Sequence, residues 1–167
     1  NSRWCTVGSI KAVHSNSGRE KMSMVKYNKA YKFRLLPNKE QETLFAKTFG
    51  CVRFIWNKML AYTDNYYKEH GKTSYITPAK FKSEFEWLKE VDSLALANTQ
   101  MNQKKAYQSF FNKKAKFPKY KSKKDTRQSY TTNNQHGTVR IDGNTIKIPK
   151  VGFIKRSEEH TSELQSH

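Results

Sequence analysis

Residues 30–60 read AYKFRLLPNKEQETLFAKTFGCVRFIWNKML, and the change of hydrophobic period within them decides the fold. In their first part apolar residues alternate with cations: Tyr31, Phe33 and Leu35 with Lys32 and Arg34. This period of two is typical of a strand with one buried and one solvated face. Pro37 follows and ends the strand, because proline cannot donate a ladder hydrogen bond.

A helix is predicted after the proline. Asn38 and Gln41 have the spacing of a capping box, in which each side chain satisfies a free backbone N–H group. Gly50 predicts a break at the end of this helix. Apolar residues then recur at helical spacing, at Val52, Ile55, Trp56 and Met59. Two helices joined at a glycine have the spacing of a helix-turn-helix, and equally of any αα-hairpin.

Further elements are predicted along the rest of the chain. Thr77 and Pro78 favour a helix start, and Asp92 or Ser93 favours a longer helix that runs to about residue 114. The stretches 127–132, 137–141 and 144–149 read as short strands separated by turns. The order of one strand, then helices, then strands predicts an α+β fold, in which a small antiparallel β-barrel carries an inserted helical lobe.

Both ends of the chain differ from its centre. Residues 1–23 lack periodicity, so we expect a leader that is disordered or untranslated. Residues 156–167, RSEEHTSELQSH, break the lysine pattern and resemble translated sequencing adapter, so we expect an artefact. Between them we expect the first barrel strand at 24–37, the helical lobe at 38–114, and a basic loop with the remaining strands at 115–155.

The composition favours a nucleic-acid partner. The chain has 167 residues, a net charge of +18 and 13% aromatic residues, which suits a folded domain with a cationic surface. No apolar run is long enough to span a membrane. Two cysteines and five scattered histidines show no metal-ligand spacing, so we expect no metal and a reducing, cytoplasmic location.

The basic segment, residues 113–127, is the densest run of charge. It holds one acid, Asp125, and eight cations: Lys113, Lys114, Lys116, Lys119, Lys121, Lys123, Lys124 and Arg127. Such a row would neutralise successive phosphates without sequence preference, and Arg53 is a further candidate for binding the nucleic-acid backbone. Phe117 and Tyr120 within it would stack on exposed bases. The alternative is a disordered charged loop whose two rings fold back onto the core.

Small polar side chains are the candidates for reading bases. Asn98, Thr99, Gln100, Asn102 and Gln103 lie within six positions of one predicted helix. Asn and Gln can pair with base edges; a solvated helix face explains any one of these residues better, but it explains five within six positions less well. Thr131 to Asn134 directly follow the basic segment. Cations would then hold the backbone while amides and hydroxyls sample bases, although turns favour Asn for conformational reasons alone.

Five stretches together resemble a known family, TnpB (OrfB). They are 28–60, 88–98, 106–124, 129–134 and 138–155, and they include FGCVRFIWNKML, AYQSFFNKKAKFPKYKSKK and TVRIDGNTIKIPKVGFIK. The family comprises RNA-guided nucleases encoded by insertion sequences and described as transposases. The resemblance covers 27–155 and implies a wedge-type β-barrel with an inserted recognition lobe.

The resemblance implies binding of guide RNA and target DNA, including a short motif beside the target. By position it assigns motif reading to Tyr75, Ser93, Ala97, Thr132 and Asn133. Some relatives carry Lys and Gln where Ser93 and Ala97 stand, so Asn98 and Gln100 are expected to take over part of that role.

The family's nuclease chemistry is not expected in this chain. The resemblance implies acidic residues that hold magnesium and a four-cysteine zinc element, both in a C-terminal part missing from this sequence. We therefore expect a fragment, truncated before the nuclease domain, that binds but does not cut and has no catalytic residues. Two alternatives remain: a free-standing helix-turn-helix domain that places 51–63, with Arg53 and Lys58, in the major groove, and a structural RNA-binding protein.

Overall fold

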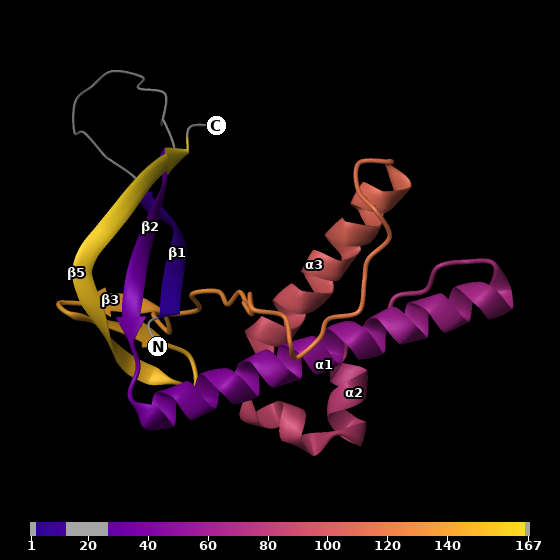
Figure 1. Ribbon diagram of the computed structural model, residues 1–167, viewed down its shortest axis with the longest axis horizontal. Helices are drawn as coiled ribbons and strands as arrows, with labels where there is room; N and C mark the ends of the chain where they lie inside the picture. Colours follow the sequence, from indigo (N-terminus) through magenta and orange to yellow (C-terminus); the bar gives the residue numbers. More distant parts are fainter. Residues whose placement is uncertain (1–2, 13–26, 166–167) are drawn as a thin grey trace.

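The computed structural model describes residues 3–12 and 27–165, with side chains described for 32–157. The elements lie in the order β1 (Arg3–Ala12), β2 (Tyr27–Leu36), α1 (Lys39–His70), α2 (Pro78–Glu84), the 3-10 helix η1 (Glu86–Glu90), α3 (Ser93–Phe111), β3 (Arg140–Asp142), β4 (Thr145–Ile148) and β5 (Gly152–Gln165). The sheet stands at one end of the molecule, and α1 runs away from its base (Figure 1). The fold is α+β, as predicted.

The strands form an open antiparallel sheet of order β1-β2-β5-β4-β3. The predicted closed barrel is therefore wrong. Closure would require β1 to pair with β3, and these strands occupy opposite edges of the sheet. β3 has only three residues, all of them exposed, so it offers little backbone for a further ladder.

Helix α1 is continuous for 32 residues and begins with the predicted capping box. Gln41 N–H donates to Asn38 Oδ1 at 2.9 Å, and Asn38 N–H donates to Gln41 Oε1 at 3.0 Å. The predicted break at Gly50 is wrong. A glycine costs an interior helical position about 1 kcal/mol relative to alanine, and the buried face that continues from Phe45 through Ile55 to Leu60 outweighs that cost. The helix ends at Gly71, whose left-handed φ of 66° suits a glycine.

The core has two parts along α1. The first half of the helix packs on the sheet through Phe45, which joins Leu35 and the buried Ile146 and Ile154. The second half packs against α2, η1 and α3 in a larger cluster: Cys51, Val52, Ile55, Met59, Ile76, Phe81, Leu88, Val91, Ala95 and Leu96. Tyr130 lies against both clusters and joins them.

Several predicted boundaries differ from the structure. The helix that starts at Pro78 ends at Glu84 and continues as η1, while α3 begins after its predicted cap, Asp92. The prediction of a strand at 127–132 is wrong, because this segment makes no ladder and instead inserts Tyr130 between the clusters.

The ends of the chain add strands that the sequence pattern did not predict. Residues 3–12, set aside as a leader, pair with β2, and β5 continues to Gln165 through the residues set aside as adapter. The rest of the expected leader, 13–26, lies outside the described residues.

Candidate nucleic-acid interface

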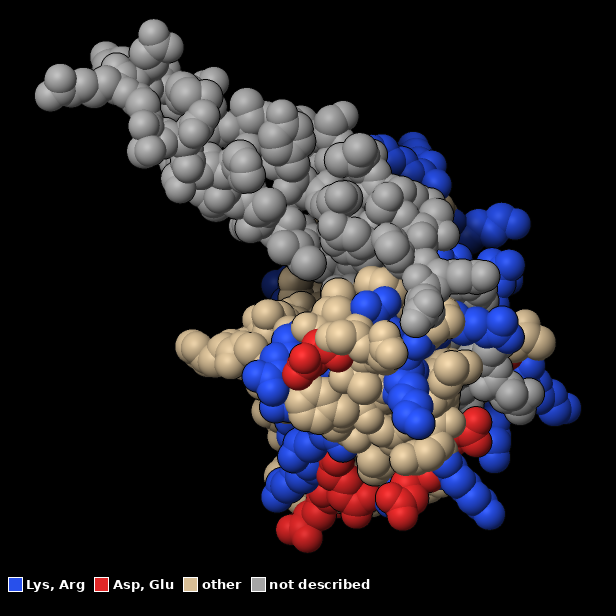
Figure 2. All heavy atoms as spheres, turned by 90° about the vertical axis from the view of Figure 1, so that its left-hand side faces the viewer, with Lys and Arg blue, Asp and Glu red and all other residues tan. Residues whose placement is uncertain are grey.

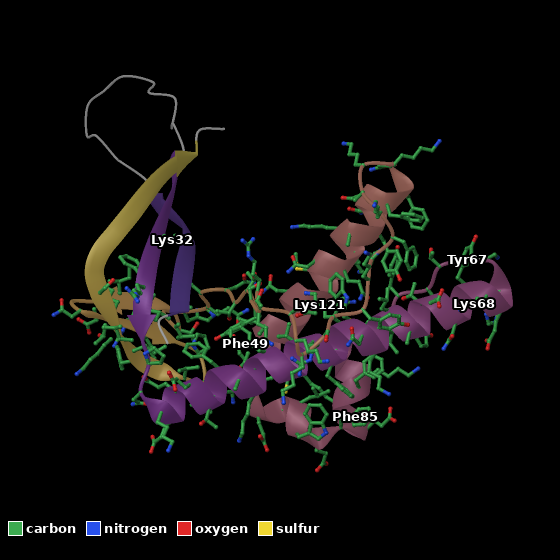
Figure 3. All side chains as sticks on the ribbon, viewed as in Figure 1. Lys32, Phe49, Tyr67, Lys68, Phe85 and Lys121 are labelled. Carbon is green, nitrogen blue, oxygen red and sulfur yellow. The ribbon has the colours of Figure 1, made fainter. Side chains whose placement is uncertain are left out.

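The basic segment is folded onto α1. It leaves the end of α3 and crosses α1 near the middle of the helix, where Lys121 lies in Figure 3. The indole N–H of Trp56 donates to the Lys119 carbonyl at 2.8 Å. Asn57 Nδ2 donates to the Lys121 carbonyl at 2.9 Å, and its Oδ1 accepts from the Lys121 N–H at 2.8 Å. Three hydrogen bonds from two adjacent residues therefore hold the backbone of the segment.

Lys121 packs onto the same anchor. Its ammonium lies 4.2 Å from the centre of the Trp56 ring, a cation–π contact. This packing removes water from the ammonium, and the desolvation lowers the pKa of Lys121, with the Asp125 charge acting in the opposite direction. An anion bound beside Lys121 would offset that desolvation cost.

The two rings of the basic segment have different surroundings. Phe117 packs edge-on against Tyr107 and Phe110, with ring centres 5.7 and 5.2 Å apart. Tyr120 is 58% exposed. Phe117 is still 44% exposed, so both rings offer surface to a partner, and Tyr120 offers more of it.

All eight cations of the basic segment have exposed side chains. Arg53, the remaining candidate for backbone binding, lies half-buried on α1. Seen from the sheet end, Lys and Arg side chains cover both flanks of the molecule, while Asp and Glu gather at its lower edge (Figure 2). The segment therefore offers its charges outward from a fixed backbone.

Three candidates for motif reading, Ser93, Ala97 and Gln100, lie along one side of α3. Ser93, Ala97, Gln100 and Lys104 follow each other at spacings of four, three and four residues, which places them on a single helix stripe. Tyr75 reaches this stripe from the linker before α2, because Lys104 Nζ lies 5.6 Å from the centre of its ring. Gln100 Nε2 donates to the neighbouring Ile76 carbonyl at 3.2 Å.

Thr132 is joined to the start of α3. The carboxylate of Asp92 caps the helix by accepting from the Leu94 N–H at 3.0 Å, and its other oxygen accepts from the Thr132 hydroxyl. Thr132 therefore lies beside Ser93, and the exposed Asn133 follows it. Residues that are far apart in the sequence are brought to one end of the stripe.

The polar run of α3 points mostly inward. Asn98 is 8% exposed, and its Nδ2 donates to the Leu94 carbonyl at 2.9 Å. The buried Thr99 donates to the Ala95 carbonyl, and the buried Gln103 donates to the Trp56 carbonyl. The density of polar residues in this run reflects internal hydrogen bonding, with Asn102 fully on the surface. Asn98 lies off the stripe that carries Ser93 and Ala97.

Sequence reasoning missed Trp56 and Asn57 as the anchors of the basic segment. Trp56 was assigned only to the apolar face of a helix, and Asn57 was not considered. A tryptophan followed by an asparagine at the edge of an apolar stripe is a weak signal, because both partners are backbone groups more than 60 residues away.

Within the described residues, no three His, Cys, Asp or Glu side chains lie together as a metal site requires. No described helix is both long enough and apolar enough to cross a membrane.

Comparisons with known proteins identify relatives of this chain. Residues 24–72 match a family model of OrfB proteins described as a helix-turn-helix domain. The chain is 32% identical over 111 residues to the virulence protein VsdF of Salmonella dublin, an alignment that covers 57% of this chain and 93% of VsdF. The chain belongs to the OrfB (TnpB) family.

Two longer relatives are named as putative RNA-guided DNA endonucleases. A putative RNA-guided DNA endonuclease of Streptomyces pristinaespiralis is 36% identical over 113 residues, which cover 64% of this chain and 28% of the relative. The putative RNA-guided DNA endonuclease InsQ of Escherichia coli is 31% identical over 135 residues, which cover 75% of this chain and 33% of InsQ. The chain thus spans about a third of the length of these relatives.

The residues matched by the OrfB family model form one strand and one long helix. The matched residues 24–72 contain β2 and the continuous helix α1. The residues proposed for a recognition helix, 51–63, bury much of their surface at Cys51, Ile55 and Leu60. Lys58 in this stretch lies over the rings of Phe54 and Phe85, at 5.6 and 5.4 Å.

Proposed function

We propose that this chain is the guide-RNA- and target-DNA-binding portion of a transposon-encoded RNA-guided DNA endonuclease. Cleavage in this proposal belongs to the remaining two thirds of the enzyme, which the alignments with the two endonuclease relatives do not reach. The protein would act at the prokaryotic nucleoid. The observation that carries the proposal is the attachment of the basic segment to α1 through Trp56 and Asn57.

A basic segment that is held on α1 can bind a polynucleotide more tightly than a flexible segment could. Ordering a flexible chain costs about 1 to 2 kcal/mol per residue, and the hydrogen bonds to α1 meet that cost during folding instead of during binding. The exposed cations can then neutralise successive phosphates and release condensed counterions. Tyr120, much of it exposed, adds a ring on which an unpaired base can stack.

The α3 stripe supplies the second half of the proposal. Ser93, Thr132 and Asn133 gather at the start of the helix, and Tyr75 lies beside Lys104 about three turns further on. Four stripe positions span about 16 Å of helix at 1.5 Å per residue. That length matches a few base pairs of duplex, so we propose that this stripe reads the short motif beside the target.

A second candidate is a free-standing helix-turn-helix domain, which the description of the matched family favours. It would place 51–63 in the major groove. The buried face of this stretch leaves Arg53, Asn57 and Lys58 as its groove-facing side chains, and Asn57 is already bonded to Lys121. The two candidate functions therefore predict that different substitutions weaken nucleic-acid binding.

The test is a binding comparison on the purified chain. We expect bound RNA to co-purify and to be released steeply by salt, and we expect the exchange of Lys116, Lys119, Lys123 and Lys124 for Gln to weaken RNA binding far more than Lys58→Gln does. Absence of any RNA shift at low salt would overturn the proposal. Binding confined to duplex DNA, with Lys58→Gln the more harmful change, would favour the free-standing domain.

A further inference from the structure

A cleft of about 350 Å³ lies between α1 and the last part of the basic segment. Phe49 and Val52 supply its apolar side, and Arg53, Lys121 and Arg127 supply cations from both of its walls. Asp125 is the acid on its lining, and the other lining residues are hydroxyl or amide side chains of 122–129. Its size falls within the range of small-molecule sites, about 300 to 1,000 Å³.

The charge of this cleft is unbalanced. Three cations face one carboxylate, and Asp125 Oδ2 already accepts from the Ser122 N–H at 2.9 Å. Among the described residues no carboxylate lies within 4 Å of the charged nitrogens of Arg53, Lys121 or Arg127. An excess of cations beside an apolar surface favours a ligand that combines an anion with a flat apolar group.

Lys121 gives independent support. Its side chain lies over the Trp56 ring, with the ammonium 4.2 Å from the ring centre, while the residue stays exposed at the surface. Desolvation lowers the pKa of Lys121, and a bound anion would counter that effect. Arg53 is likewise half-buried on the rigid helix α1. Lys121 and Arg53 are therefore held by the protein on the α1 side of the cleft, whereas Arg127 is exposed on the facing segment.

We propose that this cleft binds a single nucleotide unit, with its phosphate between Arg53 and Arg127 and its base against the half-buried ring of Phe49. Arginine suits this role because its planar guanidinium can donate two hydrogen bonds to one phosphate. Hydroxyl and amide groups of 122–129 are available to the sugar. The inference rests on the proposed function where the nucleotide belongs to a bound RNA or DNA strand, and a free nucleotide presents the same chemistry.

The experiment titrates the full chain with adenosine monophosphate, inorganic phosphate and adenosine in a calorimeter. We expect one saturable site for the monophosphate and weaker binding of the two fragments. Arg127→Gln should lower the affinity for the monophosphate by about tenfold or more, since a hydrogen bond to a charged group is worth about 1.5 to 3 kcal/mol. Lys72→Gln is the matched control: its side chain is exposed, lies outside the basic segment and does not line the cleft.

A competition arm separates the two sources of nucleotide. A single-stranded oligoribonucleotide that displaces the monophosphate assigns the cleft to the bound strand, whereas monophosphate binding without displacement assigns it to a free nucleotide. If the monophosphate does not bind, or binds equally to Arg127→Gln, the inference is wrong. If the monophosphate site fails this test but the unmodified chain still binds RNA, the proposed function stands. If the unmodified chain does not bind RNA, the proposed function is wrong as well.

Discussion

The side chain of Asn57 forms both backbone hydrogen bonds of Lys121. Its Oδ1 accepts from the Lys121 N–H at 2.8 Å, and its Nδ2 donates to the Lys121 carbonyl at 2.9 Å. One amide thereby acts as a strand partner for the basic segment. Together with Trp56 it makes the segment part of the folded structure, although its cations remain on the surface.

Replacing Asn57 with Ala should release the segment. Two lost hydrogen bonds predict a loss of about 1 to 3 kcal/mol in the free energy of unfolding. Trypsin should then cut faster within 113–127, and RNA affinity should fall because the segment must be ordered on binding. Asn65→Ala is the control, since Asn65 is exposed on the same helix. Equal rates of cleavage in the two variants would contradict the anchoring role.

Gly50→Ala should stabilise the protein by about 0.5 to 1 kcal/mol, because alanine is the better residue in a helix interior. A Cβ added at Gly50 would approach Arg53 Nη2 no closer than 3.9 Å, so nothing obstructs it. Chemical denaturation measures the change. A loss of stability would show that residue 50 adopts the turn expected of a helix-turn-helix instead of continuing α1.

The outcome at Gly50 shows how local signals compare with tertiary packing. The period-two strand, the Asn38 cap, the Asp92 cap and strand β4 follow from patterns within a few residues, and the structure confirms them. The glycine break was also a local signal, but burial of Ile55 and Leu60 on the same face as Phe45 outweighs it. A cost near 1 kcal/mol cannot interrupt a helix whose packing continues on both sides.

The site depends on contacts that no local pattern encodes. The side-chain amides of Gln100 and Gln103 donate hydrogen bonds to backbone carbonyls 24 and 47 residues away. These polar side chains therefore make contacts within the protein. Sheet closure was equally beyond prediction, because it depends on which strands occupy the two edges. The contact of Thr132 with Asp92, which brings Thr132 to the start of α3 next to Ser93, likewise joins residues 40 positions apart.

Stability at alkaline pH should depend on Tyr107. Burial, with a further contribution from the Asp64 charge, raises the pKa of Tyr107 from 10.0 to about 12. The folded protein therefore retains this proton at a pH where the unfolded chain has lost it. The resulting contribution to stability is complete below pH 10 and is lost as the pH rises to about 12.

Tyr107→Phe removes this titration. The free energy of unfolding of the unmodified chain, minus that of the variant, should decrease between pH 8 and pH 11 in urea titrations. Tyr67→Phe, at the exposed end of α1, reports the general effect of removing a phenol. A difference between the unmodified chain and Tyr107→Phe that stays constant with pH would contradict the assignment.

Thr132→Val should separate motif reading from general binding. The change removes the hydroxyl that donates to Asp92 and predicts a stability loss of about 1 kcal/mol. We expect duplexes selected from a randomised library to lose their common motif, while affinity for RNA stays the same. Thr131→Val, at the exposed neighbouring position, should retain the motif. Loss of the motif in both variants, or in neither, would argue against a specific role for Thr132.

The most direct test of the account measures RNA affinity as a function of salt for a variant in which Lys116, Lys119, Lys123 and Lys124 are Gln. A control variant carries the same charge change at four other exposed lysines: Lys39, Lys72, Lys89 and Lys150. Each phosphate contact contributes about 0.7 to the slope of log affinity against log salt for a single strand, so the first variant should lose up to about 3 from that slope. The control should keep a slope close to that of the unmodified chain. Equal slopes for the two variants would show that the basic segment is not the surface that binds RNA.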